Sequence, residues 1–299
     1  MDRPSFKEIL ALKDRGSLEL TSSCSTQTSS IMPTKPVVVI VPGSCHRAEH
    51  YQRLIDELAK CNYEATAVTP PSLDSNPPHR SWDQDAQALR RVVMENVEAG
   101  RDVIALAHSF GGVAMGEAVK GLGKRDREKY GLKGGVVGLI YMTAVALVEG
   151  QSQATLIVPQ TPKEKELALA YQEGMKKYPK GMTPINEAGM IVPDRETTRQ
   201  IVYSGGCDPK DVEEALDLLG AQPIAPMGVP VTYTAYREIP STFILCENDL
   251  AVPPYIQEKM VAQAGDAMEV VRCQEGHAPH LSNPRLVVEC IRRAAGESV

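Results

Sequence analysis

The stretch VIALAHSFGG, residues 103–112, decides the fold of this 299-residue chain, because an apolar run ends there in a histidine, a serine and two glycines. The run is typical of a buried parallel strand, and the residues after Phe110 are typical of a helix. We therefore predict that Ser109 lies in a very short turn between the two. In such a turn a serine is held in a strained conformation that exposes its hydroxyl above the sheet.

The residues around Ser109 depart at one position from G-x-S-x-G, the usual motif of a nucleophilic serine. Ala107 stands where the first glycine is usual, while Gly111 keeps the second. Backbone and helix crowd both positions, so each needs a small residue, and alanine meets that need. A serine that merely caps the following helix would also fit these ten residues. The rest of the chain has to distinguish the two interpretations.

Apolar runs and amphipathic segments alternate on both sides of this stretch. The alternation predicts strands that are each followed by a helix, and the helix at residues 81–100 has Ser81 as a plausible N-cap and Gly100 as a plausible stop. Such a series indicates an α/β fold with a doubly wound, mostly parallel sheet. The predicted strands cover residues 36–43, 63–71, 102–108, 134–144, 241–249 and 267–273.

The alternation divides the chain into three parts. Residues 36–149 and 238–299 carry the predicted α/β core, and residues 150–237 hold helical pieces that we expect to form a cap over the carboxyl ends of the strands. Residues 1–35 read as an N-terminal arm and linker, with an amphipathic helix in residues 1–20. The arm either docks on the core or on a second subunit, as in a homodimer, or is a disordered leader.

Composition narrows the class of protein. The chain is 42% hydrophobic and 23% charged with a net charge of −6, which argues against nucleic acid or an anionic membrane surface as a partner. No apolar run is long enough to span a membrane, and the charged N-terminus lacks the apolar core of a signal peptide. The seven cysteines are scattered and odd in number, as expected for reduced thiols. We therefore expect a cytoplasmic protein.

A serine hydroxyl needs a base that accepts its proton, and two residues late in the chain can supply one. Asp249 follows the predicted strand that begins at residue 241, and His277 lies in the loop after the next strand. Both would project from the sheet edge at which Ser109 emerges. Asp249 would orient His277, and His277 would take and return the proton.

Other residues near these positions compete for the two roles. Glu247 and Asn248 directly precede Asp249, and His280 lies three residues after His277. Glu247 is nearer the strand, where its side chain can point elsewhere. His277 follows a glycine in the last strand-to-helix connection, which makes it the stronger candidate for the base.

The negative oxygen that forms during attack on a carbonyl needs two N–H donors. The backbone N–H of Phe110, directly after Ser109, is one candidate. The other is the N–H of Ser44 in the loop VPGSCH, where Gly43 permits a tight turn. A simple strand-to-helix turn is the alternative interpretation of that loop.

The segments VPGSCHRAEHY, AHSFGG, YMTAVALVEGQS, IPSTFILCENDLAVPP and GHAPHLSNP occur in the order found in one known family. From about residue 36 to 297 the chain resembles the α/β-hydrolases that include plant methyl-salicylate esterases, hydroxynitrile lyases and small fungal esterase-like proteins. The resemblance implies the triad Ser109, Asp249 and His277 with oxyanion donors at Ser44 and Phe110. It implies no cofactor and no metal.

The sequence departs from the pattern of this family at several positions. Pro42 precedes Gly43 where the family often has histidine before glycine, which would change the wall of the pocket but keep the backbone donor. The lyases carry a threonine at the position of Gly43 and a lysine at that of Ala278, and this lysine helps to hold the leaving cyanide. Cyanohydrin cleavage is therefore not expected.

We expect a serine hydrolase that cleaves an ester or lactone of a medium-sized apolar small molecule. The alternatives are a non-hydrolytic enzyme of natural-product metabolism on the same fold, such as a lyase, cyclase or isomerase, and a ligand receptor without activity. The strongest candidates for substrate contact are Gly43, His108, Met190, Tyr203 and Tyr233. Further apolar residues of the cap either line the pocket or pack the cap onto the core, namely Met175, Met182, Ile185, Ile191, Ile224 and Met227.

Overall fold

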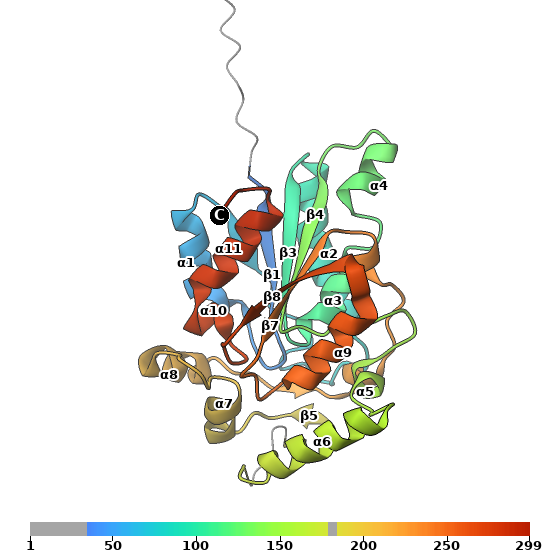
Figure 1. The fold of residues 1–299 in the computed structure, drawn as a ribbon. Coiled ribbons are helices and arrows are strands. Elements are labelled where there is room, and N and C mark those ends of the chain that lie inside the picture. Colours follow the sequence, from blue (N-terminus) through green and yellow to red (C-terminus); the bar gives the residue numbers. More distant parts are fainter. Residues whose placement is uncertain (1–34, 179–183) are drawn as a thin grey trace, which may run out of the picture. The chain divides into compact units, whose positions relative to one another are not determined.

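The computed structural model describes residues 35–178 and 184–299. Its main sheet has six strands in the order β2-β1-β3-β4-β7-β8, and every neighbouring pair is parallel (Figure 1). The predicted α/β class with a parallel sheet is therefore confirmed. The strands are β1 (Val37–Val41), β2 (Ala65–Ala67), β3 (Asp102–His108), β4 (Gly135–Met142), β7 (Ser241–Cys246) and β8 (Met268–Cys273).

Helices cover both faces of this sheet, and each face has its own apolar core. Strand β1 shows why, because Val37, Val39 and Val41 pack into one core while Val38 and Ile40 pack into the other. The first core lies under α2 (Asp83–Glu98), α3 (Gly111–Ala118) and α9 (Pro254–Ala264). The second lies under α1 (Gln52–Lys60) and α11 (Pro284–Ala294), and the short helices α4 (Lys124–Lys129) and α10 (Pro279–Ser282) complete the core region.

Helix α2 begins later than its sequence suggests. Trp82, not Ser81, is the N-cap, and no side chain caps the helix from that position. The Ser81 hydroxyl instead accepts a hydrogen bond from the N–H of Asp83 at 3.3 Å and donates one to its carboxylate. The predicted stop is close to correct, because Gly100 has a φ of +80° just after the C-cap Ala99.

The segment between β4 and β7 is built differently from the core. Outside residues 179–183 it holds two paired antiparallel strands, four helices and two 3-10 turns, and Figure 1 shows α6, α7 and α8 gathered at one end of the main sheet. Its elements are α5 (Gln153–Leu156), α6 (Pro162–Met175), β5 (Met190–Ile191), α7 (Arg195–Ile201), α8 (Pro209–Asp217), β6 (Gln222–Pro223), η3 (Ala225–Gly228) and η4 (Ala235–Arg237).

Some expectations fall outside the described residues, namely the N-terminal arm up to residue 34 and Met182 of the cap. Within residues 35–178 and 184–299, no helix is both long and apolar enough to cross a membrane. The six cysteines in those ranges are free thiols, and Cys45, Cys246 and Cys290 are buried.

Candidate active site

Ser109 occupies a sharp turn between β3 and α3. Strand β3 ends at His108 and α3 begins at Gly111, so two residues make the whole connection. Ser109 has a φ of +52°, a left-handed conformation that costs a non-glycine residue about 1–3 kcal/mol and that clusters at functional sites. Its N–H donates to the Met142 carbonyl at 3.4 Å, and its own carbonyl accepts from the N–H of Val145 at 2.8 Å.

The alternative role of Ser109 as a helix cap is wrong. The N-cap of α3 is Phe110, and no side chain caps this helix. Within the described part of the chain, the Ser109 hydroxyl has no hydrogen-bond partner, and it lines a cavity. The turn therefore presents a free hydroxyl to the space where a ligand would lie.

Three glycines let the backbone pack closely around Ser109. A Cβ atom on Gly43 would lie 2.9 Å from Cβ of Ser109, and one on Gly111 would lie 2.5 Å from the Pro42 carbonyl oxygen. A Cβ atom on Gly112 would lie 2.2 Å from the Val145 carbonyl oxygen. Gly43 is thus required because the loop after β1 touches the turn, which is a different reason from the tight turn expected of it.

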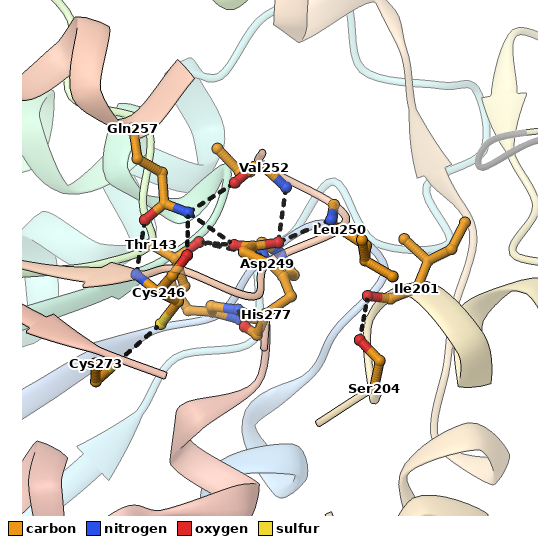
Figure 2. A network of polar contacts seen from close by, with 12 residues as sticks. Thr143, Ile201, Ser204, Cys246, Asp249, Leu250, Val252, Gln257, Cys273 and His277 are labelled. Carbon is orange, nitrogen blue, oxygen red and sulfur yellow. Dashed lines mark hydrogen bonds and ion pairs between the residues drawn. The ribbon is translucent and has the colours of Figure 1, made fainter. Parts of the chain in front are cut away.

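Asp249 and His277 form a buried pair at the ends of β7 and β8. These strands are parallel neighbours, so the loops that follow them leave the same edge of the sheet. The two residues are 1% and 4% exposed, and Nδ1 of His277 lies 2.8 Å from Oδ2 of Asp249 (Figure 2). Oδ1 of Asp249 accepts the N–H groups of Ala251 at 2.8 Å and Val252 at 2.9 Å.

Gln257 on α9 supports the carboxylate of this pair, and sequence reasoning missed this residue because no motif marks it. Its amide nitrogen lies 3.3 Å from Oδ2 of Asp249 and also donates to the carbonyls of Cys246 and Val252. Its amide oxygen accepts the N–H of Cys246 at 3.0 Å. Gln257 is fully buried, so it holds the end of β7 and the acid loop in one arrangement.

The two residues that compete with Asp249 bond elsewhere and not to His277. Glu247 bonds to the side chain of Gln274, and Asn248 donates to the Gln274 carbonyl at 2.7 Å. Both therefore tie the loops after β7 and β8 together at their outer side, and the structure leaves Asp249 as the acid next to His277.

The rival histidine, His280, is buried in α10. Its ring stacks on Tyr51 with 4.6 Å between centroids, and it is 1% exposed. Within the described residues its Nδ1 has no hydrogen-bond partner. His280 does not line the cavity that Ser109 and His277 share.

A chain of hydrogen bonds joins the loop after β1 to the loop that carries His277. The Gly43 N–H donates to the Tyr51 hydroxyl at 3.0 Å, and that hydroxyl lies 2.8 Å from Nδ1 of His108. Nε2 of His108 lies 2.7 Å from the His277 carbonyl, which can only accept. His108 therefore carries its proton on Nε2, and the Tyr51 hydroxyl donates to its Nδ1.

The two expected oxyanion donors are both free. Within the described ranges, neither the N–H of Ser44 nor that of Phe110 has a hydrogen-bond acceptor. The Ser44 carbonyl accepts from Nδ1 of His46 at 2.7 Å, and Nε2 of His46 accepts from the Tyr203 hydroxyl at 2.9 Å. This second chain fixes the orientation of the loop that carries the Ser44 N–H.

Five of the six histidines of the chain gather around this site, and burial keeps most of them neutral. Burial is the main cause that lowers the pKa of His50 to about 4 and that of His280 to about 3. It also lowers the pKa of His46 and of His108 well below the ordinary value near 6.5.

These pKa shifts predict a loss of stability in mild acid. In the unfolded chain histidines bind protons as the pH falls through about 6.5, whereas folded His50 stays neutral down to about pH 4. The unfolded state then binds more protons in this window, so the free energy of unfolding falls as the pH falls. Urea unfolding from about pH 7.5 to about pH 4.5 measures this slope. His280→Phe should make it shallower, and a flat profile in the unsubstituted protein would contradict the assignment.

The cavity that Ser109 and His277 share has a volume of about 470 Å³, within the range of sites for small molecules. Among the described residues, no Asp, Glu, Lys or Arg lines it, and no three metal-ligating side chains gather into a site for an ion. Most of the lining is apolar and comes from the segment between β4 and β7 and from the start of α9. These residues include Ile157, Ala168, Tyr171, Ile191, Ile201, Ile224, Met227, Val252, Tyr255 and Ile256.

The expected substrate contacts are only partly placed at this cavity. His108 lines it, but Gly43, Met190, Tyr203 and Tyr233 are not among the described residues of its wall, and neither are Met175 and Ile185. Tyr203 is turned instead toward His46, and Tyr233 lies under the Lys120 ammonium at 5.6 Å. The sequence missed the polar lining groups, which are Gln153, Gln172, Thr197 and Thr198.

Known proteins resemble this chain in sequence and in fold. The family described as "Alpha/beta hydrolase family" matches residues 38–290. The alpha/beta hydrolase nvfD of Aspergillus novofumigatus is 44% identical over 265 residues, which is 89% of this chain and 98% of the relative. A pyrethroid hydrolase from Sphingobium faniae JZ-2 has a similar fold, with a TM-score of 0.65 and 20% identity over 87% of this chain and 97% of that one. The methylesterase protein MES16 from Arabidopsis also has a similar fold, with a TM-score of 0.64. It is 19% identical in sequence over 87% of this chain and 99% of that one.

Proposed function

We propose, since the chain belongs to the alpha/beta hydrolase family, that it is a serine hydrolase that cleaves an ester or a lactone of a medium-sized apolar molecule. One observation carries the proposal: a strained serine with a free hydroxyl shares a cavity with a histidine that is bonded to a buried aspartate. The names of the relatives, which include hydrolases and a methylesterase, agree with it.

In the proposed reaction His277 acts as the base and then as the acid. Its Nδ1–H donates to Asp249, which leaves Nε2 to accept the proton of the Ser109 hydroxyl while that oxygen attacks the carbonyl carbon. The negative oxygen accepts the N–H groups of Ser44 and Phe110. No hydrogen bond joins the Ser109 hydroxyl to His277 within the described ranges, so this bond has to form when substrate binds.

Collapse of this intermediate breaks the bond to the alcohol, which leaves with the proton from His277. The acyl group stays on the Ser109 oxygen as an ester. Water then gives a proton to His277 and attacks the acyl carbon, and the carboxylic acid departs as Ser109 regains its proton. Formation and hydrolysis of the acyl-enzyme therefore use the same residues in the same roles.

Incubation in water labelled with oxygen-18 tests this reaction directly. Purified protein and an ester substrate should give acid and alcohol in equal amounts, with one labelled oxygen in the acid. Ser109→Ala is the control and should give neither product above background. Products that carry no label would indicate a lyase or cyclase instead, and stoichiometric binding without products would indicate a receptor.

The cavity predicts a preference for neutral substrates. A carboxylate buried there would face no Lys or Arg of the described lining, and an unpaired buried charge is costly. We expect p-nitrophenyl hexanoate to be hydrolysed with a kcat/KM at least about tenfold higher than the p-nitrophenyl monoester of adipic acid, which ends in a carboxylate. Equal or reversed values would show that a cation reaches the substrate.

A further inference from the structure

Thr143 is the first residue after β4, and the strand order places it between the nucleophile and the acid. Strand β4 lies between β3, which leads to Ser109, and β7, which leads to Asp249. His108 and Met142 are paired in the sheet, so Ser109 and Thr143 follow directly on neighbouring strands. Nothing in the motif around Ser109 draws attention to this position.

The backbone of Thr143 is strained. Its φ is +42°, in the left-handed region, where a β-branched residue is a genuine outlier. Such a conformation costs about 1–3 kcal/mol and persists only where the surroundings enforce it. Here the Thr143 N–H donates to the Ile244 carbonyl of β7 at 2.9 Å. This bond ties the strained residue to the strand that carries the acid.

The strained backbone brings the Thr143 hydroxyl against the buried pair (Figure 2). The hydroxyl donates to Oδ2 of Asp249, the same oxygen that faces His277. Its oxygen also lies 3.2 Å from Nδ1 of His277. Thr143 is fully buried, so water cannot replace the hydroxyl without a rearrangement.

These contacts give the hydroxyl two effects on the pair. As a donor it adds to the hydrogen bonds that hold the Asp249 carboxylate in place. As an acceptor it offers Nδ1–H of His277 a second partner beside the carboxylate, which restricts rotation of the ring. Three side chains then hold one another, and the ring is oriented before substrate arrives.

We propose that Thr143 is a positioning residue of the active site, which holds Asp249 and His277 in their reactive arrangement through its hydroxyl. The role rests on the proposed serine-hydrolase function. It explains why a β-branched residue is kept in a left-handed conformation where glycine or asparagine would fit with less strain.

A series of variants tests the hydroxyl separately from the shape of the side chain. Thr143→Val keeps the shape of the side chain and needs the same left-handed backbone, but it loses the hydroxyl. We expect its kcat to be about ten- to a hundredfold lower, with KM nearly unchanged. Thr143→Ser keeps the hydroxyl and should restore kcat to within a few-fold of the original value. Thr242→Val, which changes a buried threonine near the start of β7, is the matched control and should leave kcat unchanged.

Thr143→Gly is the second variant in case valine does not fold, because glycine adopts the left-handed backbone without strain and also lacks the hydroxyl. It should be as slow as Thr143→Val. Equal activity of the valine or glycine variant and the unsubstituted protein would overturn the proposal. So would a serine variant as slow as the valine variant.

A second readout separates this proposal from the proposed function. The Nδ1 proton of His277 should give a low-field proton NMR signal in the unsubstituted protein and in Thr143→Ser, and the signal should broaden or vanish in Thr143→Val. The same signal in all three proteins would overturn the positioning role even if esters are cleaved. If no ester is cleaved but the signals behave as expected, the proposed function fails and the structural role of Thr143 stands.

Discussion

Ser109→Ala should lower kcat for ester hydrolysis by at least about a thousandfold, because only the N–H donors and substrate binding then remain to lower the barrier. The fold should persist. The Ser109 hydroxyl makes no hydrogen bond within the described chain, so its loss breaks no contact. Alanine at this position has to adopt the same left-handed backbone as serine, at a similar cost. Circular dichroism and thermal unfolding check the fold, and a continuous assay with a p-nitrophenyl ester checks the rate.

Residual activity within tenfold of the original would contradict the assignment of Ser109. A second serine would then have to be the nucleophile. Ser44 is the obvious candidate, because it also lines the cavity. Ser44→Ala is therefore a useful companion variant, since it keeps the backbone N–H that the proposed mechanism uses and should retain most of the activity.

His277→Ala should be nearly as damaging, with a loss in kcat of about a thousandfold or more. Without the imidazole, no described residue next to Asp249 can take the proton of Ser109, because Asp249 is buried behind the ring. The KM should change much less than kcat, since the ring is one of many groups in the cavity wall. Steady-state kinetics with a neutral p-nitrophenyl ester measure both constants.

His280→Phe is the matched control for this prediction. Phenylalanine keeps an aromatic ring against Tyr51 and removes a ring nitrogen that has no partner among the described residues. We expect kcat to stay within about tenfold of the original. If His280→Phe were inactive and His277→Ala active, His280 and not His277 would be the base.

Much of the core could be predicted from residue patterns. The run Val37–Val41 is β-branched throughout and buried on both faces, which is the signature of a central parallel strand. The turn at Ser109 could also be predicted, because the strand, the small residues and the helix are all local in the sequence. Parallel strands end at one edge, so the approach of Asp249 to His277 followed from the order of the elements.

The support around the pair could not be predicted, because it depends on contacts between distant segments. Thr143 lies 106 residues from Asp249, and although it falls in the segment YMTAVALVEGQS, nothing in that segment indicates that its hydroxyl contacts the acid. Gln257 lies 8 residues from Asp249 and belongs to no recognisable motif. The left-handed backbone of Thr143 is imposed by its neighbours against the preference of the residue. No local pattern reports such a conformation.

The wall of the cavity was the least predictable part. The segment between β4 and β7 has short helices whose apolar residues face either the core or the cavity, and composition does not separate the two. Tyr203 illustrates the difficulty, because a buried tyrosine suggests a substrate contact, yet its hydroxyl donates to His46. The hydrogen bonds from Tyr203 to His46 and from His46 to the Ser44 carbonyl hold the loop after β1, and they could not be predicted without the tertiary structure.

The most direct test of the central claim is to label the purified protein with a fluorophosphonate, which reacts with a serine only when a base and an oxyanion site activate it. Mass spectrometry of the digested protein identifies the labelled residue. The account predicts one phosphonylated serine, Ser109, and no labelling of Ser109→Ala. A folded protein that takes up no label, or that is labelled at another serine, would contradict it.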